Sequence, residues 1–289
     1  MSCNFPLLAY QAFEKNAKGK RPIAFSPSGD THPISLPCGQ CIGCRLDKAR
    51  SWAIRIHLES LEHEKTCFIT LTYDEENIPY GQTLVPEDFT RFVKRLRKHC
   101  GPTHVRYFGV GEYGDTTQRP HYHAIIYGFD FPDRRIHVDR GDYTIDNSSV
   151  LTRLWPHGYS TVQNNSIEAA AYVSKYVVKK ITGKKEKEHY EWIDDQTGEV
   201  HQRHPEFSRM SRMPGIGHDW LKKYYSDLYP KGFATDGKGN KFPPPEYFNK
   251  LYEKWFPNDA DKLRNLRQEE VFKRYSEQNY ERMKAREKI

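Results

Sequence analysis

Residues 119–127, Arg-Pro-His-Tyr-His-Ala-Ile-Ile-Tyr, dominate the interpretation of this chain. They are rich in β-branched and aromatic side chains, which favours a strand. Side chains two apart in a strand project from the same face, so His121 and His123 point together while Tyr122 points to the other face. The segment therefore predicts a strand that presents two imidazoles on one side of a sheet.

The segment before this strand supplies a carboxylate. Residues 104–110 predict a second strand, and a loop rich in Gly, Asp and Thr joins the two as an antiparallel pair. A hairpin that closes through residues 114–120 would bring Glu112 beside His121 and His123. Two imidazoles and one carboxylate leave coordination positions for water and substrate oxygens, which suits Mn²⁺ or Mg²⁺. Paired histidines alone are more often structural, and the carboxylate changes that interpretation.

Other sites built on paired histidines fit this sequence less well. A nucleotide hydrolase of the histidine-triad kind needs a third alternating histidine, where Ile125 stands. A zinc protease needs two histidines on a helix with a glutamate after the first, and Tyr122 in a strand excludes that pattern.

A helix predicted over residues 166–181 carries two tyrosines. Tyr172 and Tyr176 lie one turn apart, with Lys175 and Lys179 on the same broad side. A phenol with a pKa of about 10 is a weak nucleophile until cations lower the cost of forming the phenolate. Such tyrosines on their own most often pack at the edge of a core. Beside the histidine pair, they predict attack on a phosphodiester that yields a 5′-phosphotyrosine and a free 3′-OH.

The remaining segments complete the predicted fold. Residues 67–73 predict a strand, a helix is expected to open at Pro86, and residues 159–162 predict an edge strand. Strands with helices between them predict an α+β fold, in which a central antiparallel sheet has flanking helices and is covered on one face.

Changes in composition divide the chain into three predicted parts. Residues 1–45 form an N-terminal segment, read as loop with a short hairpin, that carries a cysteine cluster. Residues 46–230 form the catalytic domain. Residues 231–289 form a linker followed by a highly charged helical tail.

Three cysteines crowd into residues 37–45, Pro-Cys-Gly-Gln-Cys-Ile-Gly-Cys-Arg. Cys38, Cys41 and Cys44 have the spacing of zinc ligands, which predicts a structural zinc site. The fourth Cys-Pro of an iron–sulfur ligand run is missing, so cluster chemistry is not expected. A tetrahedral site needs a fourth ligand, and the sequence offers three candidates that it does not rank: Cys3, Cys67 and His57.

The overall charge suits a polyanionic partner. Lys plus Arg number 45 against 38 Asp plus Glu, a formal net charge of +7. Cationic side chains that neutralise phosphates release counterions, although a solvated basic surface explains the same charge. The N-terminus lacks the pattern of a signal peptide, and no segment approaches the ~20 apolar residues of a membrane span. A reducing cytoplasm is therefore expected.

Several segments, in this order, resemble the HUH endonucleases, and among them the replication initiators of gokushovirus-like microviruses. Residues 68–73 resemble the first family motif, residues 119–124 the His-hydrophobic-His motif, and residues 172–180 the two-tyrosine motif. Residues 109–114 resemble the strand that supplies the carboxylate ligand in related initiators. Two further stretches are similar to segments typical of the microvirus branch: residues 37–45 and 208–217.

The resemblance implies an initiator of rolling-circle replication that nicks and rejoins DNA with a divalent cation. Tyr172, Tyr176, Lys175 and Lys179 would be the catalytic residues, and the metal ligands would be His121, His123 and Glu112. Single-stranded DNA at the viral origin is the expected partner, a host helicase or polymerase is a further candidate, and no membrane partner is expected. The host cytoplasm is the implied location. Two alternatives stay open: an HUH transposase or relaxase, and a non-catalytic cysteine-metal DNA-binding protein.

Overall fold

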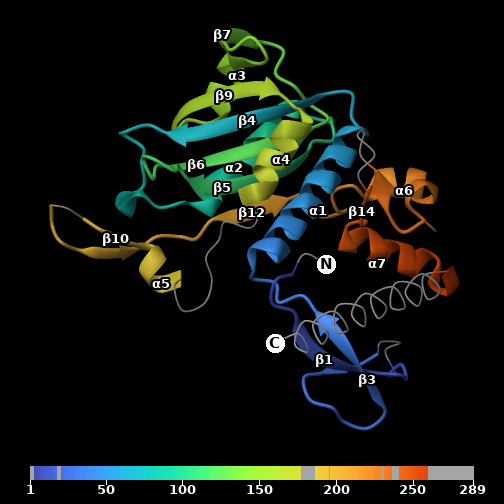
Figure 1. Cartoon of the computed structure of the whole chain (residues 1–289). Coiled ribbons are helices and arrows are strands. Elements are labelled where there is room, and N and C mark those ends of the chain that lie inside the picture. Colours follow the sequence, from blue (N-terminus) through green and yellow to red (C-terminus); the bar gives the residue numbers. More distant parts are fainter. Residues whose placement is uncertain are drawn as a thin grey trace. The chain divides into compact units, whose positions relative to one another are not determined.

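The computed structural model describes residues 3–17, 21–176, 186–194, 196–229, 231–235 and 241–259 (Figure 1). The chain divides into two compact units, Met1–Arg212 and Met213–Ile289. Among the described residues, no helix combines the length and the apolar character that crossing a membrane would require.

A seven-stranded antiparallel sheet forms the centre of the first unit (Figure 1), so the predicted α+β class with a central antiparallel sheet is confirmed. The strands lie in the order β12-β5-β6-β4-β9-β8-β7. Their bounds are β4 Thr66–Tyr73, β5 Arg106–Tyr113, β6 Pro120–Tyr127, β7 Arg135–Asp139, β8 Thr144–Asn147, β9 Gly158–Asn164 and β12 Phe207–Met210. The prediction that residues 159–162 form an edge strand is wrong, because β9 pairs with both β4 and β8.

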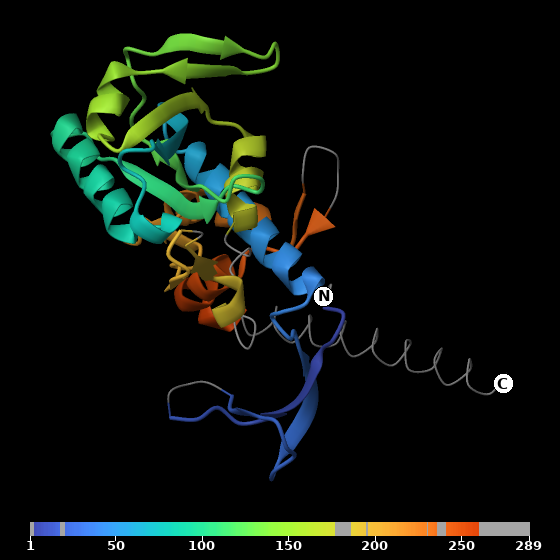
Figure 2. The same ribbon diagram turned by 90° about the vertical axis from the view of Figure 1, so that its left-hand side faces the viewer.

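Helices flank this sheet on both faces (Figure 2), so the expectation of a single covered face is wrong. α2 and α3 lie on one side, and α1 and α4 on the other. The reason is visible in β6, where Ala124, Ile125, Ile126 and Tyr127 are all fully buried, since a strand covered on both faces has a continuous apolar run. The helix bounds are α1 Ile42–Ser60, α2 Pro86–Cys100, α3 Ser149–Leu154 and α4 Ile167–Tyr176.

The main core lies between α2 and the sheet. α2 opens at Pro86, as predicted, and its Phe89 ring stacks on Tyr122 at 5.7 Å. Gly109 makes this approach possible, because a Cβ at that position would lie 2.2 Å from Phe89 Cζ. The Tyr122 hydroxyl lies 2.7 Å from the Tyr73 hydroxyl, which donates to Asp88 at 2.8 Å. Tyr122 is therefore anchored on the side of β6 opposite to the two histidines.

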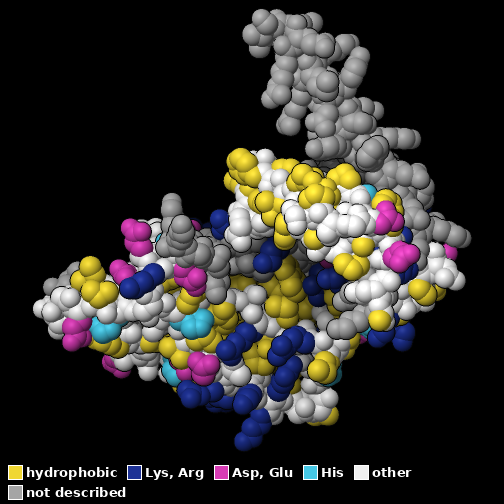
Figure 3. Space-filling model, turned by 90° about the horizontal axis from the view of Figure 1, so that it is seen from below, with side chains coloured by type: hydrophobic (Ala, Val, Ile, Leu, Met, Phe, Trp, Pro, Cys, Tyr) yellow, Lys and Arg dark blue, Asp and Glu magenta, His cyan; other side chains and the backbone are white. Residues whose placement is uncertain are grey.

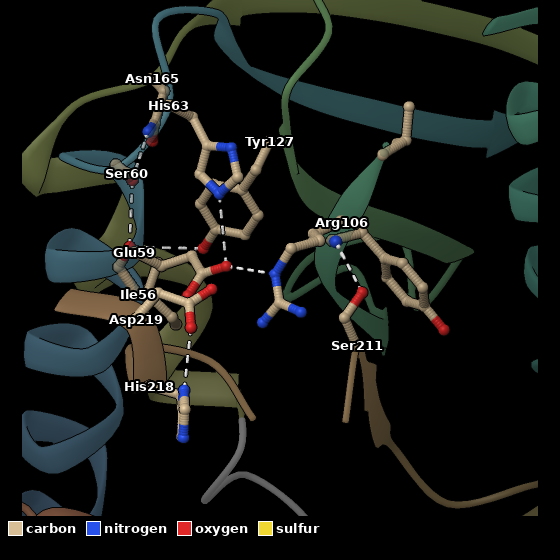
Figure 4. Close-up of polar contacts among 12 residues, drawn as sticks. Ile56, Glu59, Ser60, His63, Arg106, Tyr127, Asn165, Ser211, His218 and Asp219 are labelled. Atoms are coloured by element: carbon tan, nitrogen blue, oxygen red, sulfur yellow. Dashed lines mark hydrogen bonds and ion pairs between the residues drawn. The ribbon is translucent and has the colours of Figure 1, made fainter. Parts of the chain in front are cut away.

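A buried ion pair joins the last turn of α1 to β5 (Figure 4). The Arg106 Nε donates to Glu59, and both side chains are at most 4% exposed. The His63 Nε2 lies 3.4 Å from the same carboxylate, and the Tyr127 hydroxyl donates to the Ile56 carbonyl at 3.3 Å. These contacts fasten the end of α1 to the neighbouring strands β5 and β6.

Smaller elements surround the large sheet within the first unit. The N-terminal segment, expected as loop with a short hairpin, forms a three-stranded antiparallel sheet. Residues 191–202 form a separate hairpin. The bounds are β1 Leu7–Ala12, β2 Ile23–Ala24, β3 Thr31–Leu36, η1 Tyr80–Gln82, α5 Glu186–His189, β10 Glu191–Ile193 and β11 Val200–Gln202.

The second unit contains two helices and a two-stranded pair. Its described elements are α6 His218–Leu228, β13 Ala234–Thr235, β14 Lys241–Phe242 and α7 Glu246–Trp255. The predicted linker thus includes a short antiparallel pair. Of the predicted helical tail, residues 260–289 lie outside the described residues.

Candidate metal centre and nucleophile helix

The β5–β6 hairpin brings the three predicted metal ligands together. Glu112 pairs directly with His121, and His123 lies two residues further along the same face of β6. The Glu112 Oε1 lies 3.2 Å from His121 Nε2 and 3.0 Å from His123 Nε2. One ligand atom from each side chain lies within 4.8 Å of the other two. The hairpin therefore builds a compact set of two imidazoles and one carboxylate.

The far ring nitrogen of each histidine is also held. The His121 Nδ1 lies 3.0 Å from the Arg119 carbonyl, which can only accept, so this nitrogen carries a hydrogen. The His123 Nδ1 lies 3.0 Å from the Thr70 hydroxyl on β4. Such outer contacts fix the ring orientation of metal-binding histidines. In the neutral tautomer of His121, Nε2 is an acceptor aimed at an acceptor oxygen of Glu112, an arrangement that a shared cation satisfies.

Glu112 stays ionised although it is only 1% exposed. Burial by itself raises the pKa of this carboxyl group, but hydrogen bonds and positive charge from His121 and His123 outweigh burial and lower the pKa below its ordinary value. His123 is 6% exposed, and the His121 side chain is 17% exposed. The site therefore offers a charged oxygen ligand in a largely desolvated pocket, with its opening at His121.

α4 places both tyrosines beside His123. The ring centroid of His123 lies 5.2 Å from that of Tyr172 and 6.1 Å from that of Tyr176, and the two phenol rings are 4.8 Å apart. Tyr172 is 39% exposed, whereas Tyr176 is 7% exposed. Burial, followed by the hydrogen bond with Tyr172 and the charge of Glu112, raises the pKa of Tyr176 far above its ordinary value. The two phenols thus share one site but differ in access to solvent.

The two lysines predicted for this helix are placed differently from the tyrosines. Lys175 is exposed, and within the described part of the chain it makes no hydrogen bond or ion pair. Lys179 lies outside the described residues. The start of α4 is capped as predicted, because the Ser166 hydroxyl accepts from the Ala169 N–H at 3.1 Å.

Two residues next to His123 were not singled out in the sequence. Thr70 holds the His123 Nδ1, and the Phe68 ring stacks on the His123 imidazole at 5.4 Å with an interplanar angle of 16°. Both lie on β4, which pairs with β6 so that Thr70 is opposite His123. Their spacing of two along a predicted strand is the signal that could have identified them, because it places them on one face.

A second group of possible metal ligands lies in the N-terminal part of the chain. Cys3, Cys38, Cys41 and Cys44 place their sulfur atoms within 4.8 Å of one another, so Cys3 supplies the fourth thiol. The alternative Cys67 is buried and donates instead to the Phe129 carbonyl at 3.7 Å. Backbone N–H groups of Cys44 and Asn4 lower the pKa of the Cys41 thiol to about 6.

Comparisons with known proteins connect this geometry to phages. A family model of replication-associated proteins, named for the ORF2 protein, matches residues 66–181, from the start of β4 past the end of α4. The chain is 31% identical over 240 residues to the replication-associated protein VP4 of Bdellovibrio phage phiMH2K, covering 78% of this chain and 72% of that protein.

Two further relatives carry the same kind of name. Identity to the replication-associated protein ORF2 of Spiroplasma virus 4 is 31%, over 76% of this chain and 68% of that protein. Identity to the replication-associated protein ORF4 of Chlamydia phage 1 is 33%, over 50% of this chain and 38% of that protein. No solved structure gives a significant match.

Proposed function

Because the chain belongs to the family of replication-associated proteins of small phages, we propose that it cuts and rejoins single-stranded DNA at a replication origin. The proposed reaction forms a covalent link between a tyrosine and the 5′-phosphate, and so initiates rolling-circle replication. The observation that carries this proposal is the packing of Tyr172 and Tyr176 against His123, which in turn faces Glu112.

The divalent cation of this reaction, Mn²⁺ or Mg²⁺, would be held by Glu112, His121 and His123. The donor set fits, because the carboxylate is ionised and both imidazoles present Nε2 while Nδ1 is held from behind. When bound, such a cation withdraws charge from non-bridging phosphate oxygens and from the 3′ oxygen that leaves.

Tyr172 would be the first nucleophile. Its phenol is 39% exposed and lies against His123, so a DNA backbone can reach it, whereas Tyr176 is nearly buried. Its oxygen bonds to phosphorus, and the bond from phosphorus to the 3′ oxygen breaks. The phenol loses its proton and the 3′ oxygen gains one. The phosphodiester energy is kept in the new bond, so rejoining needs no ATP, and Tyr176 on the next turn would accept a later strand.

The open part of the sheet next to the metal centre would hold the DNA strand. Thr72 on β4 pairs with His121 on one side and with Tyr159 on the other, so these three residues share one face in a row. Tyr159 is 69% exposed, and an exposed aromatic ring offers a stacking surface for a base. Lys and Arg side chains gather in one area of the face drawn in Figure 3, which suits a polyanion. Lys175 and Lys179 would add positive charge on the nucleophile helix.

A covalent-adduct assay tests the proposal. The protein is incubated with a 5′- or 3′-labelled origin-like single strand and Mn²⁺, and denaturing gels separate free DNA from protein-linked DNA. We expect an adduct that the double variant Tyr172→Phe/Tyr176→Phe does not form, and that chelation of Mn²⁺ prevents. His121→Ala and His123→Ala should abolish nicking while DNA affinity changes little, because phosphate contacts elsewhere dominate binding. DNA binding by the wild-type protein without cleavage would reject the proposal in favour of a non-catalytic binding protein.

A further inference from the structure

We propose that Cys3, Cys38, Cys41 and Cys44 form a closed, structural zinc site that is separate from the Glu112 centre. The four thiols are free, and their sulfur atoms lie within 4.8 Å of one another. The Cys3 and Cys41 sulfurs are 3.8 Å apart. A tetrahedral zinc ion about 2.3 Å from each thiolate separates its sulfur ligands by about 3.8 Å, whereas a disulfide brings two sulfurs to about 2.05 Å. The observed spacing is that of ligands around one ion.

Backbone N–H groups already surround the sulfurs as they do in thiolate metal sites. The Cys3 sulfur accepts from the Cys38 N–H at 3.3 Å, and the Cys41 sulfur accepts from the Asn4 N–H at 3.3 Å. The Cys38 sulfur accepts from the Cys41 N–H at 3.4 Å. Four thiolates around Zn²⁺ leave a net charge of −2, and such N–H donors offset it. These contacts are independent of the sulfur spacing and favour the same conclusion.

The four cysteines come from the junction between two elements. β1 and β3 pair so that Leu7 lies opposite Leu36, which brings the chain before β1 and the chain after β3 to the same end of the sheet. Cys3 and Cys38 enter from these two segments. Cys41 immediately precedes α1, and Cys44 lies in its first turn. A zinc ion at this point would join the N-terminal sheet to the start of α1.

The N-terminal sheet needs such a link because it has almost no core. Among the described residues from 3 to 36, only Ala9 is buried. Its large apolar side chains are mostly open to solvent, with Phe5 at 71% and Phe25 at 70% exposure. Modules of this size without a core depend on a disulfide, a metal or a partner for their order. Four soft thiolate ligands select zinc among common divalent ions and leave no open position for catalysis.

Metal analysis of the full chain tests this site. The protein is purified from zinc-supplemented medium, and zinc per chain is measured by plasma mass spectrometry. We expect about one zinc per chain in the wild type, in the double variant His121→Ala/His123→Ala and in the control Cys100→Ser. Cys3→Ser should retain less than about a tenth of that amount. Zinc lost with the histidines and kept in Cys3→Ser would overturn the proposal, as would iron with the visible absorption of a cluster.

Cobalt substitution of the wild-type protein keeps the test valid if Cys3→Ser fails to fold. Co²⁺ bound to four thiolates gives intense tetrahedral d–d bands and a sulfur-to-metal charge-transfer band, which imidazole and carboxylate ligands do not produce. We expect these bands to saturate at one Co²⁺ per chain and to disappear as Zn²⁺ is added. Their absence would reject the site. The adduct assay depends on the other centre, so loss of nicking with zinc retained rejects only the proposed function.

Discussion

At the scale of single residues, His123 links the candidate metal centre to the nucleophile helix. Its Nε2 faces Glu112, its Nδ1 meets the Thr70 hydroxyl, and its ring lies between Phe68 and Tyr172. Contacts on both nitrogens and on the ring restrict its rotation. A ligand held in this way loses little freedom when a metal binds, which favours affinity.

Thr70→Val should therefore weaken Mn²⁺ binding although the substitution keeps the side-chain shape. We expect the affinity to fall about 10- to 100-fold, the range for the loss of an outer contact to a ligand histidine. The matched control is Thr161→Val, since Thr161 pairs with Thr70 from the neighbouring strand. Titration of Mn²⁺ by calorimetry or electron paramagnetic resonance measures the effect. An affinity for Thr70→Val equal to that of the control would mean that the hydroxyl does not orient His123.

The sequence allows some of these residues to be predicted and not others. His121, His123 and Glu112 follow from the period of a strand and the closure of one hairpin, both of which are local. Thr70 depends on which strand pairs with β6 and in what register, and Cys3 depends on a sheet that brings the chain start to residue 38. Contacts of this kind join distant segments, and no local period encodes them.

At the scale of elements, the ion pair between Glu59 and Arg106 fixes α1 to the sheet (Figure 4). Both groups are buried, so removal of one partner leaves the other charge in a poorly solvated position. We expect Glu59→Ala to lower the free energy of unfolding by about 3–5 kcal/mol. Urea denaturation followed by circular dichroism measures this change.

The same helix supplies the control for that measurement. Asp47 and Arg50 form an exposed pair at 3.4 Å with side chains 43% and 57% exposed, so Asp47→Ala should cost less than about 1 kcal/mol. A cost for Glu59→Ala as small as that of Asp47→Ala would show that the buried pair does not hold α1 in place.

β9 gives the second prediction at this scale. If bases stack on Tyr159, Tyr159→Ala should weaken binding of single-stranded DNA about 5- to 150-fold, because one stacked base contributes about 1–3 kcal/mol. Tyr143→Ala is the control, since Tyr143 is 54% exposed and lies in the turn between β7 and β8. Fluorescence anisotropy at fixed salt compares the two variants. Equal losses would place the DNA elsewhere on the protein.

Element types were easier to predict than element neighbours. The strands and helices from residue 66 to 176 follow from apolar periods and from signals such as Pro86 and Ser166. The inner position of β9 and the covering of the second face do not, because they depend on the pairing of β9 with β8 and on the return of α1 and α4. Polar side chains on β9, such as Thr161 and Gln163, resemble those of an edge strand.

At the scale of the whole molecule, the proposed chemistry belongs to the first unit. Met1–Arg212 contains the complete seven-stranded sheet, both groups of possible metal ligands and both tyrosines. The matched family segment, residues 66–181, also lies within it.

A fragment that ends at Arg212 should therefore fold and form the DNA adduct with a short single strand. We expect a single-turnover rate within about tenfold of the full chain, because the fragment keeps every proposed catalytic side chain that the structure describes. Circular dichroism establishes that the fragment is folded before the rate is measured. A folded fragment without activity would show that the second unit contributes directly to the reaction.

The central claim is that Tyr172 and the Glu112, His121 and His123 cluster act as one site on a DNA strand. Mass spectrometry of the adduct after nuclease and protease digestion tests it most directly. We predict a nucleotide 5′-phosphate on Tyr172 in the α4 peptide, formed only when Mn²⁺ or Mg²⁺ is present and absent in His123→Ala. A nucleotide on a residue outside α4, or a cut strand with a free 5′-phosphate and no modified peptide, would contradict the claim.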